Sequence, residues 1–253
     1  MFKNAIVKTP SQSMINGITS ANLGQPNYSN ALMQHKDYIN ALKECGLKVT
    51  VLEADEDFPD STFVEDVALC TPHCAIITNP GAETRKKEIH AMIPAIEQHY
   101  KQIEYIQSPG TIEAGDIMMV GNHYYIGLSN RTNQQGANQM IAYLNKYGMQ
   151  GSMVTMKEFL HLKTGVNYLE NNNLLASGEF LDKPEFAQYN VNEITDDEAY
   201  ATNSVWINGT VLTPKGFPKT KLIIENLGYE IREIDVSEFE KLDGGLSCLS
   251  LRF

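Results

Sequence analysis

The hydrophobic pattern of the chain changes period several times, and the changes follow one order. Short runs of alternating or continuous apolar residues predict β-hairpins, the residues after them have apolar positions at helical spacing, and a short apolar strand follows. The hairpins fall at residues 67–78, 117–128, 166–177 and 204–213. The chain is therefore predicted to repeat a ββαβ unit, although the copies share almost no residue identity.

The second copy shows this pattern most clearly. Met140, Ile141, Leu144 and Tyr147 have helical spacing, Gly148 stands at the position of a C-terminal cap, and SMVTM follows as a strand. The dipeptides at 121–122 (Gly-Asn) and 208–209 (Asn-Gly) suit two-residue hairpin turns, which need positive φ. The other copies are marked by Ile89, Met92, Ile93 and Ile96 before QIEYI, by PEFAQY before VNEIT, and by Leu222, Ile223 and Leu227 before YEIREI.

The N-terminal copy lacks one hairpin arm. Leu32, Ile39 and Leu42 predict a helix that ends at Gly46, and LKVTVL predicts the strand after it. The missing arm can be SCLSLRF at the C-terminus, paired with NAIVKT at the N-terminus. Five ββαβ units would then close into a fivefold pseudosymmetric α/β propeller, predicted as a single domain over residues 1–253. The alternative is an ordinary open α/β sheet decorated with hairpins.

Composition and charge narrow the function. Apolar residues make up 42% of the chain, which suits a packed core, and the formal charge is −11. Nucleic acids and anionic membranes attract basic proteins, so no partner of either kind is expected, whereas a small cationic substrate would be attracted. The N-terminal residues lack the apolar run of a signal peptide, and no stretch is long enough to cross a bilayer. Four scattered cysteines predict reduced thiols, so a cytoplasmic location is expected.

Unusual polar residues gather just ahead of the hairpins, at equivalent places in the repeat. These residues are FVED (63–66), IEAGD (112–116), HLKT (161–164) and GGLSC (244–248). Each motif taken alone also has an ordinary structural interpretation, as a solvated acid, a hydrogen-bonding histidine or a small core cysteine. In a closed propeller, equivalent positions converge on the axis, and together the four motifs form a set suited to a cysteine hydrolase.

The chemistry of that set centres on Cys248. A nucleophilic thiolate needs a cationic neighbour, which His161 or a cationic substrate could supply. Gly244 and Gly245 permit the close backbone approach of a tight catalytic loop. Glu113 is placed to accept a hydrogen bond from the imidazole and fix its tautomer. The run CTPHC (70–74) lacks a second ligand cluster and is interpreted as a hairpin turn with a cysteine on each arm, so no metal site is predicted.

With these residues in view, the chain resembles the guanidine-modifying superfamily, whose fold is the fivefold ββαβ propeller called the pentein fold. Within it the sequence is similar to the dimethylarginine dimethylaminohydrolase family, especially its bacterial members. The similarity covers nearly the whole chain. It rests on FKNAIVKTP, FPDSTFVED, NPGAETR, GTIEAGDIMMVG, SNRTNQQGANQM, HLKTGVNYLENNNLLASGEF and DGGLSCLSLRF.

The resemblance implies a role for each site residue. Cys248 would be the nucleophile, His161 the general acid and base, and Glu113 its carboxylate partner. The remaining residues would bind substrate: Asp66 and Glu65 at the guanidinium nitrogens with Asp60 and Phe63 nearby, Arg85 and Arg131 at the α-carboxylate, and the backbone carbonyls of Ile18 and Leu242 at the α-ammonium group. These types agree with the chemistry, because guanidinium groups and carboxylates form bidentate pairs. Cations are also unfavourable at helix starts, so a structural role for Arg85 and Arg131 there is disfavoured relative to a ligand-binding role.

The implied reaction converts Nω-methylated L-arginines into L-citrulline and methylamines through a covalent thiouronium adduct on Cys248, with no metal or organic cofactor. A homodimer is the assembly that the resemblance suggests. Arginine deiminase is the nearest alternative, but it is longer and has an aspartate where this chain has Lys163. An amidinotransferase is disfavoured by length too. A non-catalytic protein of the same fold is the alternative from another class.

Overall fold

The computed structural model describes residues 1–253 and contains five three-stranded sheets. In each sheet the central strand pairs antiparallel with one neighbour and parallel with the other. The strands are β1 (Asn4–Lys8), β2 (Lys48–Leu52), β3 (Ala68–Cys70), β4 (Ala75–Ile77), β5 (Ile103–Tyr105), β6 (Ile117–Val120), β7 (His123–Leu128), β8 (Gln150–Thr155), β9 (Val166–Tyr168), β10 (Asn173–Ala176), β11 (Asn190–Glu193), β12 (Val205–Ile207), β13 (Thr210–Pro214), β14 (Glu230–Ile234) and β15 (Leu251–Arg252). The predicted ββαβ repeat is thus present with its connecting α-helix in four units, and the fifth, between β10 and β11, has only 3-10 turns in that place.

The chain divides into two compact units. The first unit comprises Met1–Val64 and Ile194–Phe253, and it holds the sheets β15-β1-β2 and β12-β13-β14. The second unit, Glu65–Glu193, holds the sheets β3-β4-β5, β6-β7-β8 and β11-β10-β9. The single domain expected over residues 1–253 stays a prediction.

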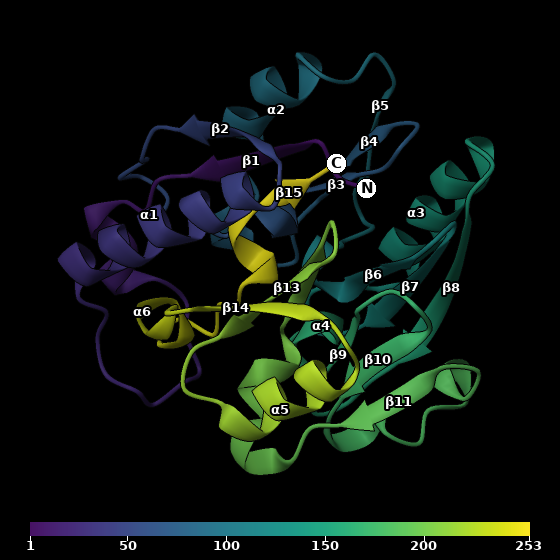
Figure 1. Cartoon of the computed structure of the whole chain (residues 1–253). Coiled ribbons are helices and arrows are strands. Elements are labelled where there is room, and N and C mark those ends of the chain that lie inside the picture. Colours follow the sequence, from purple (N-terminus) through teal and green to yellow (C-terminus); the bar gives the residue numbers. More distant parts are fainter. The chain divides into compact units, whose positions relative to one another are not determined.

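The two ends of the chain complete one sheet of the first unit. Strand β15 pairs antiparallel with β1, with Ala5 opposite Arg252 and Ile6 opposite Leu251. The carbonyl of Phe253 also accepts hydrogen bonds from the backbone N–H groups of Lys3 and Asn4. Figure 1 shows the two termini side by side. The predicted pairing of the terminal strands is confirmed.

The hairpin turns have the backbone that their residues predict. Asn208 and Gly209 both have positive φ, at 52° and 107°, as a type I′ turn requires. Gly121 has φ of 58°, which suits the first position of a type II′ turn. The turn between β9 and β10 uses a longer series with positive φ, at Glu170, Asn171 and Asn172. Local sequence therefore fixes the register of these hairpins.

The helices are α1 (Tyr28–Glu44), α2 (Ile89–Glu97), α3 (Gln134–Lys146), α4 (Leu162–Gly165), α5 (Pro218–Asn226) and α6 (Ser237–Glu240). Asn27 and Asn133 cap the N-termini of α1 and α3 through side-chain hydrogen bonds. The apolar face predicted for α5 is wrong at Leu222, which is 56% exposed, because this short helix packs through Ile224 instead. The helix expected from PEFAQY is only a 3-10 turn, Pro184–Phe186. None of the helices is both long and apolar enough to span a lipid bilayer.

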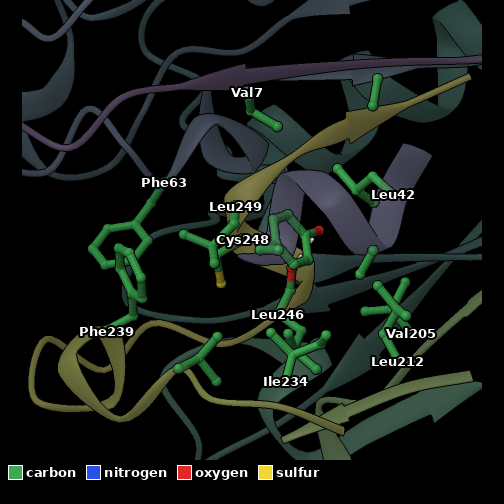
Figure 2. Packing of buried hydrophobic residues seen from close by; sticks show 14 of the residues in the cluster. Val7, Leu42, Phe63, Val205, Leu212, Ile234, Phe239, Leu246, Cys248 and Leu249 are labelled. Atoms are coloured by element: carbon green, nitrogen blue, oxygen red, sulfur yellow. Dashed lines mark hydrogen bonds between the residues drawn. The ribbon is translucent and has the colours of Figure 1, made fainter. Parts of the chain in front are cut away.

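Each unit has its own buried apolar cluster. In the first unit the cluster includes Leu42 of α1, Leu212 of β13 and Phe239 of α6, and it continues to Cys248. Figure 2 shows Cys248 beside Leu246 and Leu249, with the rings of Phe63 and Phe239 packed edge to face on one side. In the second unit, apolar side chains of β6, β7 and α3 form one cluster, and those around β9 and β10 form another. The site residues are thus held by packed cores.

The start of α3 gives a first prediction. A Cβ added at Gly136 would lie 2.1 Å from the carbonyl oxygen of Thr111, which is a backbone atom that cannot rotate away. We expect Gly136→Ala to lower the free energy of unfolding by about 1–3 kcal/mol, because this clash exceeds the gain of about 1 kcal/mol in helix propensity. Urea unfolding measures the change. Gln135→Ala, at the exposed neighbouring position, is the control, and an equally stable Gly136→Ala would contradict the prediction.

Candidate active site

The predicted site motifs occupy one structural position in four of the sheets. A short helical turn precedes the first strand of each hairpin: Val64–Val67 before β3, Ala114–Asp116 before β6, Leu162–Gly165 before β9, and Ser247–Leu249 before β15. The four motifs lie on or next to these turns. The sequence prediction that they occupy equivalent places in the repeat is confirmed.

The predicted residues are distributed over the two units. The second unit carries Glu65, Asp66, Arg85, Glu113, Arg131 and His161, whereas the first carries Ile18, Asp60, Phe63, Leu242 and Cys248.

His161 and Glu113 form a buried hydrogen-bonded pair. Both have extended backbone dihedral angles just ahead of their helical turns. Nε2 of His161 lies 3.0 Å from Oε2 of Glu113, and the other carboxylate oxygen accepts the backbone N–H of Ala82 at 2.9 Å. The residues are 7% and 1% exposed. The structure therefore contains the carboxylate–imidazole contact that the sequence predicted.

Charge in this region favours the ionised pair. Burial by itself lowers the pKa of His161, but the carboxylates of Asp116, Asp66 and Glu113 outweigh it and raise that pKa to about 9. Burial would raise the pKa of Glu113, yet the hydrogen bond and charge of His161 dominate and, with Arg85 and the Ala82 N–H, lower it. At neutral pH, His161 is thus an imidazolium that can donate a proton.

Asp66 is paired with Arg85. Nη1 of Arg85 lies 2.5 Å from Oδ2 of Asp66, and the backbone N–H of Gly115 donates to Oδ1 at 3.1 Å. Nε and Nη2 of Arg85 both bind Glu88, directly before α2, and all three side chains are buried. Arg85 thus binds two carboxylates of the same unit, which the sequence did not predict. Its predicted place at a substrate carboxylate stays a prediction.

Arg131 is the more accessible arginine. Its side chain is 20% exposed, and Nη1 lies 3.9 Å from Oε1 of Glu113. It stands in the loop before α3, where its backbone N–H donates to Oγ of Ser129. A partly exposed guanidinium beside a buried carboxylate can accept a bidentate anion.

Glu65 forms an ion pair that the sequence did not predict. Its Oε1 lies 2.6 Å from Nζ of Lys163, and the two side chains are only 6% and 12% exposed. A signal was present in the sequence, because each residue lies within two positions of a predicted site residue and their charges are opposite. A substrate guanidinium at Glu65 would therefore compete with the Lys163 ammonium group for the carboxylate, or share the carboxylate with it.

Cys248 lies in a tight loop of the first unit. Its Sγ accepts the backbone N–H of Gly245 at 3.4 Å, and the residue is 6% exposed. A Cβ at Gly244 would lie 2.1 Å from the Phe63 ring, and one at Gly245 would lie 2.5 Å from Oδ1 of Asn203. Both glycines are thus required by close approach, as predicted.

Further residues hold this loop and were missed by the sequence analysis. Asn203 accepts the backbone N–H of Ser247 at 2.9 Å and donates to its Oγ at 3.0 Å. The hydroxyls of Tyr200 and Tyr38 donate to the carbonyls of Gly244 and Leu246. These partners lie far away in sequence, so no local pattern could identify them.

The other predicted residues of the first unit gather around Gly17. Oδ1 of Asp60 accepts the backbone N–H of Ile18 at 2.9 Å, and a Cβ at Gly17 would lie 3.3 Å from Leu242. Phe63 packs edge-on against Phe239, with ring centroids 6.2 Å apart. The structure therefore brings Ile18, Asp60 and Leu242 together, while their binding roles stay predictions.

Asp66, Glu113 and His161 have ligand atoms within 4.8 Å of one another, a spacing that could accommodate a cation. In this structure these atoms bind protein groups: Asp66 binds Arg85, and Glu113 binds His161. We therefore interpret them as a hydrogen-bonded cluster. The run CTPHC is the hairpin turn that was predicted, between β3 and β4, and all four cysteines are free thiols.

Comparison with solved structures confirms the predicted fold class. A dimethylarginine dimethylaminohydrolase from Pseudomonas aeruginosa, a cysteine-to-serine variant complexed with citrulline, has a TM-score of 0.99 and 54% identity over 100% of both chains. A dimethylarginine dimethylaminohydrolase adduct with S-methyl-L-thiocitrulline, in a histidine-to-glycine variant, matches equally well. The N-terminal domain of the cyanobacterial arginine dihydrolase ArgZ shares the fold at 18% identity, with a TM-score of 0.90. The chain thus has the pentein-type α/β-propeller fold.

Sequence comparison identifies the family. The description "N,N dimethylarginine dimethylhydrolase, eukaryotic" belongs to a family model that matches residues 10–203. The N(G),N(G)-dimethylarginine dimethylaminohydrolase of Pseudomonas aeruginosa is 54% identical over 100% of both chains, and that of Streptomyces coelicolor is 31% identical over 99% of this chain and 96% of its own. This chain belongs to the dimethylarginine dimethylaminohydrolase family.

The charge of His161 predicts a pH-dependent contribution to stability. Its pKa of about 9 in the folded protein exceeds the ordinary 6.5, so the contribution is complete below about pH 6.5 and is lost as the pH rises through 9. The difference in unfolding free energy between the native protein and His161→Asn should shrink by about 3 kcal/mol from pH 6 to pH 10. Urea titrations test this, with the exposed His90→Asn as control. A constant difference would show that His161 is not held as an imidazolium.

The Glu65–Lys163 pair predicts a large, partner-dependent loss of stability. Lys163→Met leaves Glu65 buried without its cation and should lower the free energy of unfolding by about 3–5 kcal/mol. Adding Glu65→Gln should recover most of that loss. Lys86→Met breaks an ion pair of the same 2.6 Å length that is exposed, and it should cost at most about 1 kcal/mol. Equal losses in both lysine variants would contradict the interpretation.

Proposed function

We propose that this chain hydrolyses Nω-methylated L-arginines to L-citrulline and methylamines, with Cys248 as nucleophile and His161, oriented by Glu113, as acid and base. The observation that carries the proposal is the buried, ionised His161–Glu113 pair in a chain 54% identical to a dimethylarginine dimethylaminohydrolase over its full length. Related proteins have been solved with citrulline and as an adduct with S-methyl-L-thiocitrulline, which are the kinds of product and intermediate that this reaction would give.

The first half of the reaction forms a covalent adduct. The thiolate of Cys248 attacks the guanidinium carbon and gives a tetrahedral intermediate. The imidazolium of His161 then gives its proton to the methylated nitrogen, so that the C–N bond breaks and the amine leaves neutral. A thiouronium group remains on Cys248. The raised pKa of His161 suits this step, because the proton to be donated is already present at neutral pH.

The second half releases the product. His161, now neutral, removes a proton from water, and the hydroxide attacks the thiouronium carbon. The C–S bond breaks, the hydroxyl proton of the intermediate passes to solvent, where the released amine takes up one proton, citrulline leaves, and the Cys248 thiolate is restored. One water is consumed for each amine released, so citrulline and dimethylamine form in equal amounts from dimethylarginine. None of these steps uses a metal or an organic cofactor.

Substrate binding is proposed for the remaining residues. Asp66 and Glu65 would hold the guanidinium, near Asp60 and Phe63. Arg131 would bind the α-carboxylate, which its partly exposed guanidinium supports. Arg85, engaged by Asp66 and Glu88, would have to share its donors to assist. The carbonyls of Ile18 and Leu242 would accept the α-ammonium protons.

Arginine deiminase is the second candidate function. The pairing of Lys163 with Glu65 argues against it, because a carboxylate that already holds an ammonium group is poorly suited to grip a fully unmethylated guanidinium edge. A non-catalytic role is disfavoured too, since a binding protein would have no use for a cysteine, a histidine and a glutamate at equivalent places in the repeat. A cytoplasmic location, supported by the four free thiols, and a homodimer are also proposed.

Incubation with asymmetric dimethylarginine and, separately, with arginine tests the proposal. We expect citrulline and dimethylamine in equal amounts from the first substrate and little ammonia from the second. Cys248→Ser should abolish turnover, whereas Cys45→Ser should preserve it. Mass spectrometry after treatment with a chloroacetamidine should find the label on Cys248 alone. Ammonia released from arginine at a comparable rate would favour the deiminase, and equal labelling of all four cysteines would contradict catalysis.

A further inference from the structure

Asp116 is a fully buried carboxylate for which the mechanism above has no use. It is 0% exposed, and no lysine or arginine lies within ion-pair distance of it. Three donors contact its oxygens: the backbone N–H of Leu162 reaches Oδ1 at 3.0 Å, and the hydroxyls of Ser129 and Thr132 reach Oδ2 at 2.7 Å and 2.6 Å. Burial of a carboxyl group costs desolvation energy, so a structural or functional role that offsets this cost is expected.

The direction of these hydrogen bonds favours a negative charge on Asp116. Oγ of Ser129 already accepts the backbone N–H groups of Arg131 and Thr132, and Oγ1 of Thr132 accepts that of Glu113. Backbone N–H groups can only donate, so each hydroxyl has its own proton left to donate to Asp116. Two hydroxyls and one N–H therefore donate to the Asp116 oxygens, an arrangement that favours the carboxylate form, whereas burial raises the pKa of Asp116.

The same hydrogen bonds lead to three proposed site residues of the second unit. Leu162 directly follows His161. Thr132 holds the backbone N–H of Glu113 at 3.2 Å, and Ser129 holds that of Arg131 at 3.0 Å. The Asp116 side chain is therefore linked through one intervening residue to the backbone of His161, of Glu113 and of Arg131.

We propose that Asp116 is a positioning residue: through Leu162, Thr132 and Ser129, its carboxylate holds His161, Glu113 and Arg131 in one fixed arrangement. Its charge also acts on the His161 ring, together with Asp66 and Glu113, while Arg85 and Arg131 oppose these anions nearby. This inference rests on the proposed acid–base role of His161.

Asparagine cannot replace this carboxylate. If the amide oxygen faces the two hydroxyls, the amide NH₂ faces the N–H of Leu162 and two donors meet. If the amide is turned round, the NH₂ faces hydroxyl oxygens that already accept backbone N–H groups. Asp116→Asn therefore removes the charge and also breaks part of the network, whereas Thr132→Val removes one connection and keeps the charge.

The test measures the pKa of His161 by NMR in full-length protein with isotope-labelled histidine, assigned by the signal missing in His161→Gln. We expect Asp116→Asn to lower that pKa by about one unit or more, because one of the neighbouring anions is lost. The kcat for citrulline formation should fall about 10- to 100-fold. In the profile of kcat against pH, the alkaline limb should move to lower pH. Thr132→Val should lower kcat and leave the pKa raised.

Glu198→Gln is the matched control. Glu198 is a buried carboxylate of the first unit that accepts two backbone N–H groups and one hydroxyl, from Lys219 and Thr220, and it contacts none of the proposed site residues. This variant should shift neither the His161 pKa nor the pH profile. An unchanged His161 pKa in Asp116→Asn would overturn the proposal. If Asp116→Asn does not fold, a Thr132→Val variant with the same kcat as the native protein would overturn it instead. Because the NMR titration needs no turnover, it decides the inference even if the native protein makes no citrulline.

Discussion

The charged hydrogen bond between His161 and Glu113 is the interaction around which the second unit is organised. Both groups are almost completely buried, so the charge of each depends on the opposite charges and hydrogen-bond donors placed around it. The pair remains ionised because further groups complete its surroundings: the Ala82 N–H binds Glu113, and Asp66 and Asp116 add negative charge near the imidazolium. Arg85, which is paired with Asp66 and Glu88, limits the excess of negative charge in this region. Removal of any one charge changes the proton affinity of the others.

The repeat explains how such a group of residues arises. A helical turn stands before the first hairpin strand of each sheet, and the predicted polar motifs stand on or next to four of those turns. A turn of this kind leaves backbone N–H groups and side chains free of the sheet, while the strand after it is anchored in an apolar cluster. The fold thus supplies a rigid base and a variable position, which allows chemistry to change without loss of the core.

The charged partners also bear on specificity. Glu65, which the family resemblance assigns to the substrate guanidinium, is already paired with Lys163. An acid that shares its charge with an ammonium group binds a guanidinium more weakly than an acid with no such partner, and in that role Glu65 would leave one edge of the substrate without a hydrogen-bond acceptor. That arrangement suits a guanidinium whose nitrogen carries methyl groups in place of hydrogen-bond donors.

Local patterns in the sequence were sufficient for the ββαβ repeat, the primed turns, the pairing of the terminal strands, and the motifs that carry Cys248, His161 and Glu113, because these depend on periodicity, backbone dihedral angles and residue type. The exposed side of Leu222, the engagement of Arg85 by Asp66 and Glu88, the Glu65–Lys163 pair and the network around Asp116 were decided only by the tertiary structure. Each of these depends on which groups far apart in the chain share a buried space. The energy of a buried charge or hydrogen bond is set by that neighbourhood, which no local pattern records.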